Sequence, residues 1–271
     1  MSETPQTPFS DTRIMGILNV TPDSFSDGGH YAALEFALEH ALLMHAEGAD
    51  IIDVGGESTR PGYREIPAAE ETARVVPVIR ALAGFVPLPV SVDTYKAAVA
   101  DAALSAGASI VNDIWGLQRD ADMAAVIARH KAGVIVMHNR IETDAETDIV
   151  ADMLSFFRRS LEIAGRAGVD AGGIVLDPGI GFGKTRTQNI SAINAVPVLK
   201  EAFGLPVLVG ASRKSLIGAI TGSPVEERLA GTLAAHMMAV QRGADIIRVH
   251  DVKAHKDALK VISAIERGIP K

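Results

Sequence analysis

Short runs of β-branched and other apolar residues alternate along the chain with longer amphipathic stretches. In three places a helical pattern ends in Gly-Ala and an apolar run follows, beginning at Gly48, Gly107 and Gly243. Glycine ends a helix where φ can be positive, and a continuous apolar run is typical of a parallel strand that is buried on both faces. The intervals between the three glycines suit two and then four units of about 30 residues, the size of a βα repeat. These runs are therefore predicted to be the second, fourth and eighth strands.

Five further apolar runs complete a set of eight strands. They cover residues 14–20, 90–93, 134–138, 174–177 and 207–210. Helical patterns lie between the strands, over residues 32–47, 68–82, 96–106, 121–130, 149–167, 189–203, 224–242 and 255–267. Strict alternation of strands and helices in a chain of this length predicts an α/β fold, the (β/α)8 TIM barrel. An open doubly wound sheet is the alternative, although its G-x-G-x-x-G motif does not open the first helix.

Length and hydrophobic content fit one large domain. The chain has 271 residues, of which 48% are hydrophobic, and this is enough for a single large core. We expect one catalytic domain at residues 13–268 after an N-terminal tail at residues 1–12. The polar, proline-bearing start lacks the features of a signal peptide, and no apolar run approaches the roughly 18 residues that a membrane span needs.

Charge and cysteine content exclude several classes of protein. The net charge of −7 argues against a general nucleic-acid-binding protein, which usually carries an excess of Lys and Arg. An anionic ligand must therefore be held by a few local cations. Because the chain contains no cysteine, disulfides, thiolate metal sites and a cysteine nucleophile are excluded. We expect a cytoplasmic protein that binds neither nucleic acid nor membranes.

Polar residues follow nearly every predicted strand. They are Asn19, Glu57 with Thr59 and Arg60, Asp93, Asn112, His138, Asp177, Arg213 with Lys214, and Arg248 with His250. Any one of them could instead cap a helix or hold a loop. In a (β/α)8 barrel the active site lies at the carboxyl ends of the strands, so we expect these side chains to converge there. Carboxylates and amides mixed with cations indicate a site for a polar heterocycle that carries an anionic group.

Seven motifs occur in order between about residue 14 and residue 252. They are MGILNVTPDSFSDGG (15–29), DVGGESTRPG (53–62), SVDT (91–94), NDI (112–114), DPGIGFGK (177–184), SRKS (212–215) and RVHDV (248–252). Together they resemble the signature segments of the dihydropteroate synthase family. Two positions depart from the pattern: Ile180 stands where some members have Phe, and Asn139 follows His138 where some have Met. Both are expected near the pterin pocket.

The resemblance implies a transferase of folate biosynthesis. Such an enzyme condenses 6-hydroxymethyl-7,8-dihydropterin pyrophosphate with 4-aminobenzoate to give 7,8-dihydropteroate and pyrophosphate. The reacting methylene is attached to an electron-rich pterin, so pyrophosphate can leave by an SN1-like path, and the neutral amine needs positioning more than deprotonation.

Two alternatives remain for the function. A pterin-binding methyltransferase domain shares the barrel but should lack the aminobenzoate loops and the SRKS motif. A catalytically silent barrel, retained as a binding partner, should have lost part of the site. Its expected losses would fall among Asn19, Arg60, Asp177, Lys214 and Arg248, all of which are present.

The resemblance implies a pterin pyrophosphate site at the strand ends. Its residues are Asn19, Thr59, Asp93, Asn112, Asp177, Lys214, Arg248 and His250, of which Asp93, Lys214, Arg248 and His250 are also expected to be catalytic. A carboxylate such as Asp177 can accept two hydrogen bonds from the 2-amino group and the adjacent ring N–H of a pterin. Its alternative role is to cap the loop that follows it. Arg248 and His250 are two residues apart on the last strand, so they share a face and would bind the diphosphate.

The loops after the first two strands are expected to bind 4-aminobenzoate, because long loops in a compact barrel are usually functional. The resemblance implies Phe25, Thr59, Arg60, Pro61, Phe182, Lys214 and Ser215 as the contacts. It also implies Mg²⁺, with Asn19 as the one named protein ligand, which suits an ion that keeps several waters. A homodimer that forms through the last helices is expected from the same resemblance. The histidines within apolar helical stretches, such as His40, His45 and His236, are expected to be packing or surface residues.

Overall fold

Eight parallel strands form the centre of the molecule in the computed structural model, which describes residues 11–20, 29–57 and 65–267. They are β1 (Arg13–Asn19), β2 (Ile51–Gly55), β3 (Val90–Asp93), β4 (Ile110–Asp113), β5 (Gly133–Met137), β6 (Ile174–Asp177), β7 (Leu208–Val209) and β8 (Ile246–Val249). The three glycine-led runs form β2, β4 and β8, as predicted. Gly48, Gly107 and Gly243 have φ values of 99°, 117° and 96°, so each ends its helix in a conformation that favours glycine.

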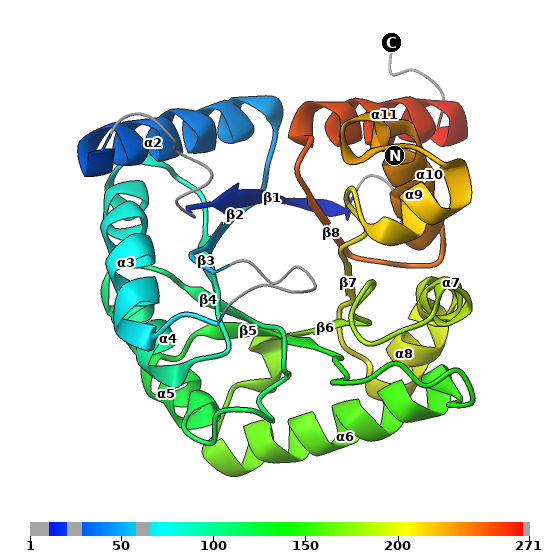
Figure 1. Cartoon of the computed structure of the whole chain (residues 1–271), viewed down its shortest axis with the longest axis horizontal. Helices are drawn as coiled ribbons and strands as arrows, with labels where there is room; N and C mark the ends of the chain where they lie inside the picture. The colour runs from blue at the N-terminus through cyan, green and yellow to red at the C-terminus, as the bar shows by residue number, and fades with distance from the viewer. Residues whose placement is uncertain (1–10, 21–28, 58–64, 268–271) are drawn as a thin grey trace, which may run out of the picture.

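The sheet closes into a barrel. Its strand order is β6-β5-β4-β3-β2-β1-β8-β7, and the two outer strands meet where Leu176 forms a parallel bridge with Val207. At this seam the Leu176 N–H donates to the Pro206 carbonyl over 2.9 Å. Figure 1 shows the strands at the centre and the helices around them. The predicted (β/α)8 TIM barrel is confirmed, and the open sheet is excluded.

Helices follow the strands along the chain. They are α2 (Gly29–Glu47), α3 (Ala68–Phe85), α4 (Ala97–Ser105), α5 (Met123–His130), α6 (Ile149–Ala167), α7 (Arg186–Asn194), α8 (Val196–Phe203), α9 (Ser215–Thr221), α10 (Leu229–Gln241) and α11 (Val252–Arg267), with 3-10 turns η2 (Ala171–Gly173) and η3 (Val225–Glu227). The helix predicted over 189–203 is wrong in one respect, because it is divided at Ala195. Pro197 cannot donate a backbone hydrogen bond within a continuous helix, and its ring would clash with the preceding turn. The short helix α9 was not predicted.

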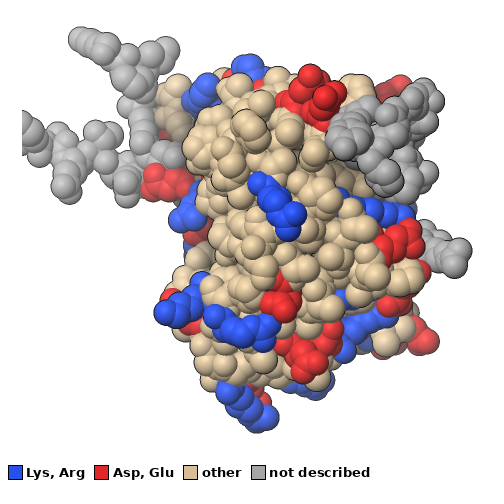
Figure 2. Space-filling model, turned by 90° about the vertical axis from the view of Figure 1, so that its left-hand side faces the viewer, with Lys and Arg blue, Asp and Glu red and all other residues tan. Residues whose placement is uncertain are grey.

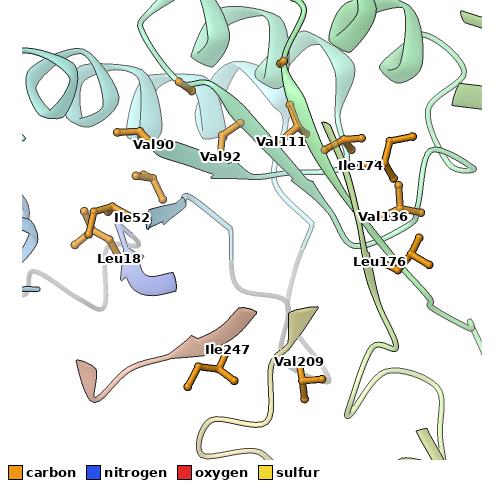
Figure 3. Packing of buried hydrophobic residues seen from close by; sticks show 14 of the residues in the cluster. Leu18, Ile52, Val90, Val92, Val111, Val136, Ile174, Leu176, Val209 and Ile247 are labelled. Atoms are coloured by element: carbon orange, nitrogen blue, oxygen red, sulfur yellow. The ribbon is translucent and has the colours of Figure 1, made fainter. Parts of the chain in front are cut away.

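Successive side chains along each strand point alternately to the outside and the inside of the barrel, so the apolar residues form two separate clusters. One set of side chains packs with apolar residues of the surrounding helices in the main core, and Figure 3 labels Leu18, Ile52, Val111, Val136 and Leu176 among its strand residues. A smaller set fills the inside of the barrel, with Met15, Ile51, Ile135, Leu208 and Ile246 buried and Ile110 and Val175 packed against them. Residues two apart on a strand share a face. Asp53, Asn112, Asp177 and Arg248 each follow one of these inner residues by two positions, so the inside of the barrel becomes polar towards the carboxyl ends of the strands.

The outer surface carries charges of both signs. Figure 2 shows Lys and Arg side chains interspersed with Asp and Glu on the side of the molecule that Figure 1 places at the left, where α2 to α5 lie. Among the described helices, none combines the length and the apolar character that a membrane span requires.

Candidate active site

Arg248 joins two carboxylates inside the barrel. Its Nε donates to Asp53 Oδ2 over 2.6 Å, and its Nη2 donates to Asp93 Oδ2 over 2.7 Å. Asn112 Nδ2 donates to the same Asp53 oxygen over 3.1 Å. The side chains are 18% (Arg248), 0% (Asp53) and 11% (Asp93) exposed. Charges this deeply buried persist only when they are paired and hydrogen-bonded, so the four residues form one connected polar floor.

Asp53 is a site residue that the sequence analysis missed. Candidates were sought after the apolar runs, whereas Asp53 lies within one, between Ile52 and Val54. A carboxylate inside a strand that is otherwise wholly apolar needs a buried partner. This signal was present in the sequence and predicts a cation on a neighbouring strand, although it does not identify Arg248.

Asp177 lies at the end of β6 and is 5% exposed. Its Oδ1 accepts the Gly179 backbone N–H over 2.7 Å. This bond is the loop-capping role that the sequence left open as an alternative. It engages one oxygen only, and among the described residues no donor is assigned to Oδ2. The same carboxylate can therefore hold its loop and accept hydrogen bonds from a ligand.

Lys214 extends its ammonium towards this floor from the N-cap position of α9. Its Nζ lies 4.2 Å from the centre of the Phe182 ring, in cation–π geometry. Burial, together with the positive charge of Arg248, lowers the pKa of Lys214 to about 8 against the opposing carboxylates Asp177 and Asp93. The preceding Arg213 has a φ of 56°, a left-handed conformation that is rare outside glycine and that turns the chain at this point.

Asp93 and Asp177 hold protons more tightly than ordinary aspartates. Burial raises the pKa of Asp93 to about 7, because it outweighs the attraction of Arg248 and is reinforced by the charge of Asp53. Burial likewise raises the pKa of Asp177 to about 6, against the Gly179 N–H and the charge of Lys214. Burial thus favours the protonated form of both carboxyl groups.

An apolar wall adjoins the polar floor. Tyr95, Ile114 and Met137 are buried together, and Trp115 and Phe182 pack against them. These residues follow or end strands β3, β4, β5 and β6. Apart from Phe182 they were not predicted as site residues, since single apolar residues after a strand give no distinctive signal. A flat apolar wall beside convergent polar groups is the usual form of a pocket for a ring heterocycle.

Two polar residues complete the rim. His250 is half-buried, and its Nδ1 lies 2.9 Å from Ser212 Oγ, which also accepts the His250 backbone N–H over 3.2 Å. Asn19 ends β1 and is exposed; its Oδ1 lies 3.5 Å from the position that a Cβ on Gly55 would occupy, and Asp93 borders the same space. Both residues are where the sequence predicted them, at the carboxyl ends of β8 and β1.

Three residues that the sequence placed on the rim turn away from it. His138 is fully buried outside the barrel, with Nε2 3.0 Å from Asp152 Oδ2, because the preceding Met137 takes the inward direction. Glu57 pairs with Lys96, and Arg213 pairs with Asp251. The prediction that all the strand-end polar residues converge is therefore wrong for these three.

The structure describes only part of the predicted aminobenzoate site, and it also shows where the two departures from the family motifs lie. Phe25, Thr59, Arg60 and Pro61 lie outside the described residues. Ser215 is exposed at the first turn of α9. Ile180 is 1% exposed within the main core, and Asn139 Oδ1 accepts the Arg140 backbone N–H over 2.8 Å. Ile180 thus packs in the main core, and the Asn139 side chain is engaged with the backbone of its own loop.

A pair of buried histidines links the loops after β7 and β8. The Ala211 N–H donates to His236 Nε2 over 2.9 Å, His236 Nδ1 lies 2.9 Å from His255 Nε2, and His255 Nδ1 lies 2.7 Å from the Asp251 carbonyl. These contacts are all satisfied when both rings are neutral and protonated on Nδ1. Burial lowers the pKa of both histidines, which favours that state. His236 is thus a connecting residue, while His40 and His45 are exposed, as expected.

The comparisons with known proteins agree on one family. The family described as "Pterin binding enzyme" matches residues 15–250. A dihydropteroate synthase from Bacillus subtilis is 50% identical over 254 residues, which cover 94% of this chain and 88% of the relative. Among solved structures, a Clostridium difficile dihydropteroate synthase in the presence of pteroic acid has a TM-score of 0.91 and 48% identity, covering 95% of this chain and 97% of that chain. A Xanthomonas albilineans dihydropteroate synthase with 4-aminobenzoic acid has a TM-score of 0.90 and 44% identity, covering 97% and 95%.

The raised pKa of Asp177 predicts a pH-dependent stability. A carboxyl group whose pKa is higher in the folded protein stabilises the fold fully below its unfolded pKa, and that contribution is lost as the pH rises through the folded value. With pKa values of 3.8 unfolded and about 6 folded, Asp177→Asn should gain about 2.5 kcal/mol of unfolding free energy relative to the parent between pH 4 and pH 8. Urea denaturation across this range measures the difference.

Two buried histidines change the stability with pH in the opposite direction to Asp177, and comparing the variant with the parent cancels their effect. Burial lowers the pKa of His138 to about 3 and that of His236 well below its usual range, so both histidines make the fold more stable as the pH rises. They do so equally in the two proteins. A stability difference that stays constant from pH 4 to pH 8 would show that Asp177 titrates normally.

Proposed function

Because the chain belongs to the pterin-binding enzymes and, within them, to the dihydropteroate synthases, we propose that it condenses 6-hydroxymethyl-7,8-dihydropterin pyrophosphate with 4-aminobenzoate. A C–N bond forms at the pterin methylene, the C–O bond to the diphosphate breaks, and the products are 7,8-dihydropteroate and pyrophosphate. The observation that carries this proposal is the convergence of Asp177, Asn112 and Lys214 with the Asp53–Arg248–Asp93 network inside the barrel, beside an apolar wall.

The pterin would lie between the wall and the floor. Asp177 would accept hydrogen bonds from the 2-amino group and the adjacent ring N–H, and Asn112 offers both a donor and an acceptor for another edge of the ring. Lys214 would donate to the pterin carbonyl. Because Asp177, Asn112 and Asp93 stand on strands, the pocket is rigid before the ligand binds.

The diphosphate would face Arg248, His250 and Asn19. As the C–O bond breaks, its electron pair leaves with pyrophosphate, where these donors stabilise the growing negative charge. Positive charge develops on the pterin methylene at the same time, and a cation nearby favours the ionised form of Asp93. The amine of 4-aminobenzoate then forms the new bond and releases a proton to solvent. This SN1-like path needs no general base.

The residues at the end of β1 fit Mg²⁺. Asn19 offers an amide oxygen beside the open space above Gly55, which a side chain there would fill. No cluster of three or more His, Cys, Asp or Glu that could hold a metal is present in the described ranges. Such a site suits Mg²⁺, which keeps several waters and is usually held by one or two protein groups together with substrate phosphates. When bound, the ion would neutralise charge on the leaving diphosphate.

The aminobenzoate would bind on the solvent side of the pterin. Of the contacts expected for it, Phe182, Lys214 and Ser215 lie among the described residues, and Phe25, Thr59, Arg60 and Pro61 would supply the rest from the first two loops. Lys96 fixes the described ends of the second loop, because its Nζ binds the Glu57 carboxylate and, over 2.8 Å, the Ile66 carbonyl. The loop therefore starts and ends at fixed points.

A homodimer is proposed through the outer face of the last third of the chain. Apolar residues line a groove between α7, α9 and α10, among them Ile190, Leu216, Ile220, Ala234 and Met238. Ile220 is 60% and Met238 45% exposed. A contiguous apolar surface of this kind marks an interaction site. The contact would thus include α7 and α9 as well as the last helices.

We also place the enzyme in the cytoplasm, because its charged diphosphate substrate cannot cross a membrane unaided. The two alternative functions lose support on different grounds. The SRKS motif of the synthases is present, and none of Asn19, Asp177, Lys214 and Arg248 is lost. A barrel retained only for binding has no need of this complete set.

Release of pyrophosphate tests the function directly. The purified protein should release pyrophosphate from the pterin substrate when 4-aminobenzoate and Mg²⁺ are present, with formation of 7,8-dihydropteroate in equal amount. Omission of 4-aminobenzoate should abolish product formation. A protein that binds both substrates but forms no product would be a binding protein, and one that methylates a substrate would be a methyltransferase.

Asp177→Asn should weaken pterin binding severely. An amide at this position presents a donor to the pterin donors, and loss of a charged pair of hydrogen bonds in a closed site costs on the order of 2–4 kcal/mol. Calorimetry with a pterin ligand measures the affinity. Asp170→Asn is the control, because Asp170 caps η2 away from the pocket, and it should bind the ligand like the parent. Equal affinity in both variants would remove Asp177 from the pterin site.

Met238→Glu should separate the proposed dimer. A carboxylate introduced into the apolar groove would lose its hydration on association, and an unpaired buried charge is strongly unfavourable. Sedimentation velocity should show a dimer for the parent and a monomer for the variant. Phe85→Glu is the control, since Phe85 is 72% exposed at the end of α3 and lies outside the groove. A monomeric parent, or a variant that stays dimeric, would contradict the proposed interface.

A further inference from the structure

The ammonium of Lys184 lies in a ring of backbone carbonyls. Its Nζ donates to the carbonyls of Gly179, Phe182 and His138 over 2.9, 3.1 and 3.3 Å. The residue is 8% exposed. Among the described residues, no carboxylate forms an ion pair with it. Three carbonyl oxygens therefore satisfy the three N–H groups of an otherwise unpaired buried cation.

The loop that forms this ring is specified by three glycines. Gly179, Gly181 and Gly183 have φ values of 68°, 86° and 56°, which favour glycine at every second position. A Cβ on Gly179 would lie 1.9 Å from the His138 carbonyl oxygen, and one on Gly183 would lie 2.4 Å from that of Arg140. The loop after β6 is thus pressed against the loop after β5. The Gly179 and Phe182 carbonyls of the ring belong to the loop after β6, and the His138 carbonyl belongs to the loop after β5.

The same loop carries two contacts of the pterin site. The Gly179 N–H holds Asp177, and Phe182 places its ring under the Lys214 ammonium. Gly179 and Phe182 are also the residues whose carbonyls bind Lys184. Burial lowers the pKa of Lys184 to about 7, so holding a cation here has a free-energy cost that carbonyl acceptors offset. An apolar residue would avoid that cost, but it would leave the His138 and Phe182 carbonyls without this donor, and the Gly179 carbonyl with only the Phe182 N–H at 3.2 Å.

We infer that Lys184 is a positioning residue of the pterin site, an internal cation that gathers the β5 and β6 loops and thereby sets Asp177 and Phe182. The inference rests on the proposed function for its effect on catalysis. It has a consequence of its own, because rings of backbone carbonyls also bind monovalent metal ions. When the lysine side chain is removed, a small monovalent cation should be able to take its place.

The test uses Lys184→Ala, with Lys200→Ala as the matched control. Lys200 also donates to a backbone carbonyl, that of Gly243 over 2.9 Å, and pairs with Asp245, but at the opposite end of the barrel. Trp115, the one tryptophan of the chain, packs in the cluster that contains Phe182. Its fluorescence therefore reports on the loop without any substrate. Each protein is measured in K⁺ and in tetramethylammonium, which has the same charge but is too large for the ring.

In tetramethylammonium, Lys184→Ala should shift the Trp115 emission and lower the affinity for pteroic acid about tenfold, the loss expected when one hydrogen bond between Asp177 and the ligand is weakened. K⁺ should restore most of both properties. Lys200→Ala should lose stability alone, with emission, affinity and cation dependence like those of the parent. If Lys184→Ala behaves like Lys200→Ala, or if K⁺ and tetramethylammonium act alike on it, the inference is overturned.

A variant that does not accumulate in folded form is refolded from urea in the two salts. A higher yield in K⁺ supports the carbonyl ring, and equal yields contradict it. The fluorescence and refolding measurements involve no reaction. They therefore separate a failure of this inference from a failure of the proposed enzymatic function, which the pyrophosphate assay of the parent protein tests.

Discussion

The guanidinium of Arg248 between Asp53 and Asp93 is the interaction on which the pocket depends. Two carboxylates inside a closed barrel would repel each other, and the low polarity of the interior would amplify the effect. Arg248 neutralises them from β8, which β1 separates from β2, with hydrogen bonds of 2.6 and 2.7 Å. The three side chains come from β8, β2 and β3, so the network also spans part of the barrel interior. The polar floor and the orientation of Asn112 follow from it, and Arg248 limits the rise in the pKa of Asp93 that burial causes.

Sequence alone predicted the barrel because its signals are local. Eight apolar runs, three glycines with positive φ and a helix over 149–167 each depend on residues close in sequence. Errors arose where distant residues decide the outcome. Whether a strand-end side chain points into the barrel depends on the register of the whole strand, so His138 was assigned to the wrong side. Asp53 was missed because its meaning depends on Arg248, which lies on a strand far away in sequence.

The site is held by connections behind it as much as by its own residues. Lys96 joins the ends of the second loop, Lys184 joins the loops after β5 and β6, and the His236–His255 pair joins the loops after β7 and β8. Each connection ends on backbone atoms. Backbone groups that are buried need partners, and here those partners lie on neighbouring loops, so satisfying them also fixes the distances between strand ends. The positions of the pocket residues are thus fixed by hydrogen bonds that satisfy buried backbone groups around the pocket.

A ligand in the pocket would stabilise the barrel at the seam between β6 and β7. One bridge, Leu176 to Val207, closes the barrel there, and β7 has only two residues. Asp177 stands on one side of this seam and Lys214 follows the strand on the other. A pterin bound to both would act as a non-covalent cross-link across the weakest join of the barrel, and any ligand that binds only the closed form stabilises it by mass action. The substrate would then reinforce this join, so the resistance of the barrel to opening between β6 and β7 would depend on how fully the pocket is occupied.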